Sequence, residues 1–202
     1  MTALPFERRR AALLAIDLQG VFCRQDGAIG RQPGRDMAAC AAAAGLALEL
    51  VAAARQAGMP VIWTRHVLRD DYADGGLLTG WLRPGLKAIG ALRASDPETA
   101  LIATPAAADT VIDKPRFSAF HATPLDAVLR ARGIDSLLVC GVTTSMCVES
   151  TVRDAGQRDY AVLVVREACA DFDAARHEAS LAAIAFGFGR VIGFADAMAI
   201  LA

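Results

Sequence analysis

Short apolar segments recur along the whole chain and form its clearest pattern. A segment of this length without a polar face is typical of a strand that is buried on both sides of a parallel sheet. The predicted strands are residues 11–17 (AALLAID), 61–65 (VIWTR), 110–113 (TVID), 136–142 (SLLVCGV), 161–167 (AVLVVRE) and 190–194 (RVIGF).

Helices are predicted between most of these strands from their capping and stop residues. The alanine-rich segment 37–57 follows Asp36, which can cap a helix, and it ends at Gly58. Further helices are predicted over residues 123–133, 143–156 and 173–189. Strand and helix therefore alternate. This predicts an α/β fold, a three-layer α-β-α sandwich around a mostly parallel six-stranded sheet.

Residues 66–109 form a long connection between two predicted strands, with a weak helical pattern near residues 82–93. Connections of this length in a compact domain are often lids or binding loops. The segment is therefore a candidate part of a binding site.

Composition limits the class of protein. The 202 residues suit one domain, residues 1–202, and a content of 54% hydrophobic and 21% charged residues is typical of a globular chain. A net charge of −1 gives no support for nucleic-acid binding. The most apolar predicted helix contains Glu49 and Arg55, so no membrane span is expected.

The cysteines indicate a reducing compartment. There are five, an odd number, and none shows the spacing of a zinc site. Charged residues interrupt the N-terminal segment before an apolar signal sequence could form. We therefore expect a cytoplasmic protein with free thiols.

Three residues with reactive side chains lie at the carboxyl ends of predicted strands. Asp17 ends the first strand, Lys114 follows the third, and Cys147 lies just beyond the fourth, near a helix start. Ligands bind at this edge of a doubly wound sheet. Each residue alone is more often structural than catalytic, because a buried cysteine usually fills space. Together the three form a workable site for nucleophilic acyl transfer.

These residue types fit that chemistry. Helix starts and nearby cations lower the pKa of a thiol, so the helix start and Lys114 are expected to favour the Cys147 thiolate. Asp17 can accept the thiol proton and return it to a leaving amine. Backbone N–H groups at the helix start can bind a developing oxyanion.

The chain resembles the isochorismatase-like cysteine hydrolases over residues 11–195. The segments that carry this resemblance are LLAIDLQGVF, VIDKPRFSAF, LDAVLRARGIDSLLVCGVTTSMCVESTVRDA and YAVLVVREACAD. The resemblance implies the strand order 3-2-1-4-5-6 and a catalytic triad of Asp17, Lys114 and Cys147. It also implies a cis peptide bond between Val142 and Thr143, with the N–H groups of Thr143 and Cys147 forming the oxyanion hole.

The branches of this family differ in substrate. Isochorismatases proper lack the cysteine, and nicotinamidases carry a metal site with an Asp-x-His pattern just after the second strand. This chain has Thr64, Arg65 and His66 there, so neither a metal nor another cofactor is expected, and a nicotinamidase-like amidase is the alternative. The closest resemblance is to N-carbamoylsarcosine, ureidoacrylate and biuret hydrolases. It implies a small amide or ureide substrate and a homodimer or homotetramer.

A substrate pocket is expected near the same strand ends. Phe22, Trp63 and Phe117 are candidates for an apolar wall, and Arg65 is the first candidate to bind a substrate carboxylate. Phe120, Arg69 and Arg116 are weaker candidates for the same roles. The aromatic residues could equally be ordinary core, and an arginine in such a place is more often a solvated charge.

Two functions of other classes also remain open. A non-catalytic nucleotide or flavin module would have a glycine-rich loop after the first strand, where this chain offers only Gly20. A redox-sensing thiol protein would have a resolving cysteine beside Cys147, but Cys140 lies in a predicted buried strand. Both therefore rank below the hydrolase.

Overall fold

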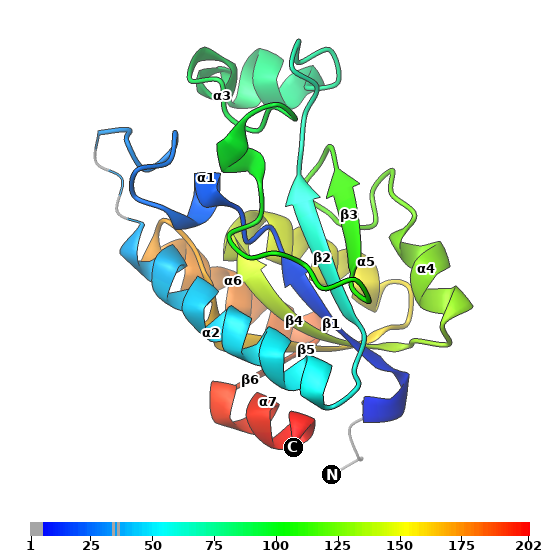
Figure 1. The fold of residues 1–202 in the computed structure, drawn as a ribbon. Helices are drawn as coiled ribbons and strands as arrows, with labels where there is room; N and C mark the ends of the chain where they lie inside the picture. The colour runs from blue at the N-terminus through cyan, green and yellow to red at the C-terminus, as the bar shows by residue number, and fades with distance from the viewer. Residues whose placement is uncertain (1–5, 34, 36) are drawn as a thin grey trace.

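The computed structural model describes residues 6–33, 35 and 37–202. Its centre is a six-stranded sheet with the order β3-β2-β1-β4-β5-β6, and every neighbouring pair is parallel (Figure 1). The strands are β1 (Ala11–Ile16), β2 (Val61–His66), β3 (Thr110–Lys114), β4 (Ser136–Val142), β5 (Ala161–Ala170) and β6 (Arg190–Ile192). The predicted fold class and strand order are therefore confirmed.

The two central strands are the most apolar because they are covered on both faces. Every residue of β1 and β4 is buried, and β1 pairs with β2 on one side and β4 on the other. The edge strands β3 and β6 are shorter and keep exposed or half-buried residues. Position in the sheet thus explains why some segments are continuously apolar and others are mixed.

Helices cover both faces of the sheet and complete the three layers. One face carries α2 (Ala38–Gln56) and α7 (Phe194–Leu201), and the other carries α4 (Leu125–Ala131), α5 (Glu149–Gly156) and α6 (Ala174–Gly187). Side chains alternate along a strand, so Leu13 joins the first of the two apolar cores and Leu14 the second.

The long helix α2 is apolar enough by composition to cross a bilayer. Its buried residues, however, pack against the sheet and α7 in one apolar core. Met37 occupies the N-cap position of this helix, and Asp36, the predicted cap, lies outside the described residues.

The C-terminal part differs from the prediction in two places. β5 continues to Ala170, three residues beyond the predicted segment 161–167, and its pairing with β4 shifts register between Val139 and Gly141. The predicted strand 190–194 is wrong at its end, because β6 stops at Ile192 and Gly193 becomes the N-cap of α7. The apolar residues of α7 resembled the end of a strand because a three-residue edge strand precedes them directly.

The connection 66–109 is structured rather than irregular. It contains a π-helical turn (Leu78–Leu82), α3 (Pro84–Ala88) and a 3-10 turn (Pro97–Thr99). Leu68 and Leu92 are buried residues of this connection and are linked by a backbone hydrogen bond of 2.8 Å. Figure 1 shows α3 and its flanks beyond the carboxyl ends of β2 and β3.

Candidate active site

Asp17, Lys114 and Cys147 meet at the carboxyl edge of the sheet. Asp17 directly follows β1, Lys114 is the last residue of β3, and Cys147 lies in the π-helical turn Thr144–Val148 that follows β4. All three side chains are buried. The sequence placed these residues at three separate strand ends, and the parallel sheet brings those ends together.

An ion pair fixes the acid of this group. Lys114 Nζ lies 2.7 Å from Asp17 Oδ2, and the Thr64 hydroxyl donates to Asp17 Oδ1 at 2.6 Å. Lys114 Nζ also donates to the carbonyl of Arg116 at 3.1 Å. Asp17 has a φ of 51°, a left-handed conformation that aspartate adopts more readily than bulky residues. Both carboxylate oxygens of Asp17 are therefore engaged and its orientation is set.

The charges of this site control the protonation of its lysine and cysteine. Burial alone lowers the pKa of Lys114, but attraction to Asp17 and Cys147 outweighs burial and raises that pKa. Burial raises the pKa of the Cys147 thiol well above 9.0, Asp17 raises it further, and Lys114 only partly opposes them. The expectation of a thiol acidified at rest is therefore wrong. The free protein holds a protonated lysine beside a neutral thiol.

The backbone before Cys147 is tightly constrained. The peptide bond between Val142 and Thr143 is cis. Gly141 has a φ of 128°, and a Cβ there would collide with the backbone of Ile16, so only glycine allows β4 to approach the end of β1 this closely. The chain then enters the turn that carries the thiol.

Side chains from α6 and from the residue that follows β5 anchor that turn. Asp171, just after β5, accepts hydrogen bonds from the backbone N–H of Ser145 at 2.9 Å and from its hydroxyl at 2.6 Å. His177 Nδ1 lies 2.8 Å from the Thr144 hydroxyl. Arg176 makes an ion pair with the same Asp171 at 3.2 Å. Asp171 and His177 thus hold the turn that carries Cys147.

A cavity of about 680 Å³ opens onto Cys147. Its apolar lining includes Phe22, Leu78, Leu82, Phe117, Met146 and Phe172. Its polar lining includes His66, Thr143, Ser145 and Asp171, and the cationic residues are Arg35, Arg83 and Arg176. The volume suits a small molecule, and the lining combines apolar walls with a few polar groups, as small-molecule sites do.

Two of the predicted pocket residues line this cavity and two do not. Phe22 and Phe117 are part of the lining. Trp63 lies in the core beneath α2, where its Nε1 donates to Asp109 at 2.9 Å. Arg65 makes a bidentate ion pair with Asp113 on β3, at 2.6 and 2.7 Å. Predicting Trp63 and Arg65 was wrong because alternate residues of β2 face away from the cavity.

The weaker candidates also have other partners. Phe120 is buried in the second apolar core against Tyr160, with ring centroids 5.7 Å apart. Arg69 makes an ion pair with Asp71 at 2.9 Å, and Arg116 donates to the carbonyl of Asp74 at 2.9 Å. None of the three lines the cavity.

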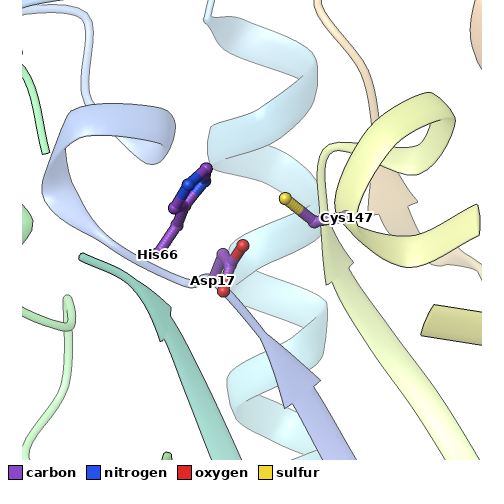
Figure 2. Close-up of side chains that lie close together, drawn as sticks. All are labelled: Asp17, His66 and Cys147. Atoms are coloured by element: carbon purple, nitrogen blue, oxygen red, sulfur yellow. The ribbon is translucent and has the colours of Figure 1, made fainter. Parts of the chain in front are cut away.

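His66 is the residue of β2 that does reach the site. Figure 2 shows its ring beside the Cys147 sulfur and the Asp17 carboxylate, and a donor atom from each of the three lies within 4.8 Å of the other two. Such a set resembles a metal site, but the Lys114 ammonium already contacts Asp17 and would repel a cation. The residues fit an ion poorly, and the absence of a metal stays a prediction.

Comparison with known proteins gives the family. A family model described as the isochorismatase domain matches residues 11–196. The chain belongs to the isochorismatase family. It is 34% identical over 177 residues to the ureidoacrylate amidohydrolase RutB of Methylorubrum extorquens, covering 81% of this chain and 71% of the relative. It is 35% identical over 181 residues to the RutB of Klebsiella pneumoniae, covering 82% and 75%.

Solved structures of family members have the same fold. A cysteine hydrolase from Pseudomonas syringae pv. phaseolicola matches with a TM-score of 0.87 at 33% identity, covering 98% of this chain and 94% of that one. An isochorismatase family protein from Desulfovibrio vulgaris matches with a TM-score of 0.81 at 29% identity, covering 96% and 98%. The first of these is named a cysteine hydrolase and the curated relatives are named amidohydrolases, so the chain is placed among enzymes rather than among flavin or nucleotide modules.

Sequence reasoning missed several residues of the site. Asp171 follows a strand end just as Asp17 does, and this position was a usable signal. Thr64 and Gln19 gave no signal, since their hydrogen bonds cross between strands that are far apart in sequence. The cationic lining from Arg83 and Arg176 depends on how the connection 66–109 and α6 fold over the sheet, which no local pattern reports.

Proposed function

We propose that this protein hydrolyses the C–N bond of a small linear ureide or amide through a thioester on Cys147. The observation that carries the proposal is a buried thiol facing a cavity, next to an aspartate that is paired with a lysine. A small-molecule substrate is supported by the relatives named as ureidoacrylate amidohydrolases and by the size of the cavity.

The first step in this mechanism is activation of the thiol. Asp17 accepts the proton of Cys147 as the sulfur attacks the substrate carbonyl carbon, so a free thiolate need not accumulate. Burial and Asp17 raise the thiol pKa, which fits proton transfer together with attack. Lys114 stays protonated and offsets the negative charge shared by sulfur and carboxylate.

The second step is stabilisation of the oxyanion. The S–C bond forms while the carbonyl π electrons move to oxygen. The N–H groups of Thr143 and Cys147 are proposed to donate to that oxygen. Removal of one such donor elsewhere costs about 3–4 kcal/mol of transition-state stabilisation. Asp171 and His177 keep the donors in place by anchoring the turn.

The remaining steps return the enzyme to its starting state. Asp17 gives its proton to the leaving nitrogen as the C–N bond breaks, which leaves an acyl or carbamoyl thioester. Asp17 then takes a proton from water, whose oxygen attacks the thioester carbon, and Cys147 leaves and regains a proton. The net reaction adds one water and releases an amine or ammonia together with a carboxylate or carbamate.

Ammonia release across a panel of ureides and amides tests the proposal. Wild-type protein should turn over at least one member, and Cys147→Ala should abolish turnover while keeping the same unfolding temperature. Cys40→Ala is the matched control, because it removes a buried thiol from α2, away from the cavity. Turnover that survives Cys147→Ala, or a wild type inactive on the whole panel, contradicts the proposal.

The predicted homodimer or homotetramer and the cytoplasmic location stay predictions. Light scattering on the purified chain measures the first directly.

A further inference from the structure

The backbone of His66 is held by hydrogen bonds to a buried glutamine. Its backbone N–H donates to Gln19 Oε1 at 2.7 Å, and its carbonyl accepts from Gln19 Nε2 at 3.2 Å. Gln19 Nε2 also donates to the Thr99 carbonyl at 2.6 Å. Gln19 is buried, so these bonds lock the end of β2 to the end of β1.

The imidazole ring is fixed as well. The Pro115 carbonyl hydrogen-bonds with the ring, and Phe117 packs edge-on against it, with ring centroids 5.9 Å apart and an interplanar angle of 85°. The side chain is almost fully buried, yet Nε2 has no hydrogen-bond partner in the described part of the chain. Because the Pro115 carbonyl can only accept and Nε2 has no partner, we assign the ring proton to the other nitrogen, Nδ1. Nε2 is therefore a lone-pair acceptor.

The charge of the ring supports this assignment. Burial lowers the pKa of His66 to about 3, and Lys114 and Arg116 lower it while Asp17 raises it. The ring is neutral near neutral pH, so with its one proton on Nδ1 the Nε2 atom can only accept. A buried acceptor without a partner is unfavourable, and a ligand that donates to it removes that cost.

The position of this acceptor matters for substrate choice. The His66 ring lies beside the sulfur that attacks and the carboxylate that protonates the leaving nitrogen (Figure 2). A ureide carbonyl carries two nitrogens, one that leaves and one that stays, whereas a simple amide carries only one. With the oxygen at the backbone donors and the leaving nitrogen at Asp17, the third substituent is the one left to face His66.

We propose that His66 is a specificity-determining residue, whose Nε2 accepts a hydrogen bond from the ureide nitrogen that stays bonded to the carbonyl carbon. This inference rests on the proposed function and narrows its substrate class to ureides. A methylene or methyl group in place of that nitrogen leaves the acceptor unpaired, and sites built to bind an N–H discriminate strongly against such analogues.

Three compounds that differ by one atom test the inference. In 3-ureidopropionate both carbonyl substituents are nitrogens, and glutaramate and N-acetyl-β-alanine each replace one of them with carbon. Their dissociation constants are measured by calorimetry on a Cys147→Ala background, with His66 intact, with His66→Phe and with His66→Gln. Phenylalanine keeps an aromatic ring against Phe117 but no acceptor, whereas glutamine supplies an acceptor oxygen.

The expected result is a preference of about tenfold or more for 3-ureidopropionate over the one analogue that has carbon in place of the nitrogen that stays. His66→Phe should remove most of that preference, and His66→Gln should restore part of it. Equal losses for all three compounds, or no preference with His66 intact, overturn the inference. Turnover of the same compounds by the chain with Cys147 present is a separate readout. If the chain with Cys147 turns over none of these compounds, that result counts against the proposed function. The binding preference still decides the role of His66.

Discussion

Lys114 Nζ lies 2.7 Å from Asp17 Oδ2, and neither side chain is exposed to solvent. The parallel register of the sheet produces this contact, because β3 and β1 flank β2 and their carboxyl ends lie at the same edge. Burying one charge alone is very unfavourable, so each residue of the pair makes the ionised form of the other tolerable.

Removal of one partner should therefore destabilise the fold as well as stop catalysis. Lys114→Met leaves Asp17 buried without its cation, and we expect a loss of about 3–5 kcal/mol in the free energy of unfolding. The double variant Asp17→Asn with Lys114→Met should recover much of that stability but no turnover. Urea unfolding with ammonia release measures both, and a single variant with wild-type stability would contradict the pairing.

His66 should make stability depend on mildly acidic pH. Its pKa is about 3 in the fold against an ordinary 6.5, so between these values the unfolded chain binds a proton that the folded chain does not. Its contribution is thus complete above 6.5 and is lost as pH falls towards 3, by up to about 1.4 kcal/mol per pH unit. Relative to wild type, His66→Gln should lose less stability over this window in urea titrations. Identical slopes for the two proteins would mean that His66 titrates normally.

Asp171 should influence turnover through the turn that carries Cys147. Asp171→Ala leaves the Ser145 N–H without its acceptor and frees Arg176, so kcat should fall by about tenfold or more with a smaller change in KM. Asp171→Asn keeps an acceptor oxygen and should recover part of the rate. An alanine variant with unchanged kcat would show that the turn keeps its shape without this anchor.

Arg83 is expected to bind a substrate carboxylate in place of Arg65. It lines the cavity, and within the described residues its guanidinium makes no hydrogen bond or ion pair. Arg83→Ala should raise KM for 3-ureidopropionate by about tenfold, since hydrogen bonds to charged groups are stronger than neutral ones. KM for the uncharged N-ethylurea should not change. Arg130→Ala on α4 is the control, because Arg130 pairs with Asp126 outside the cavity.

The sequence predicted the parts of this protein that local pattern encodes. Continuous apolar segments predicted the strands, and the strand ends predicted where Asp17 and Lys114 would meet. The direction of a side chain near a strand end was harder to predict, because Arg65 and His66 are adjacent yet face different surroundings. The thiol pKa was also mispredicted, since burial depends on packing by distant segments and outweighs the local cation.

The cavity has a floor and a roof that come from different parts of the chain. Cys147 and His66 line the floor near strand ends with Asp17 beside them, whereas Leu78, Leu82 and Arg83 line the cavity from the connection 66–109. Side chains of that connection can therefore alter substrate choice without moving the reacting atoms. Exchange of that one connection between relatives offers a route to new substrates that leaves the reacting atoms where they are.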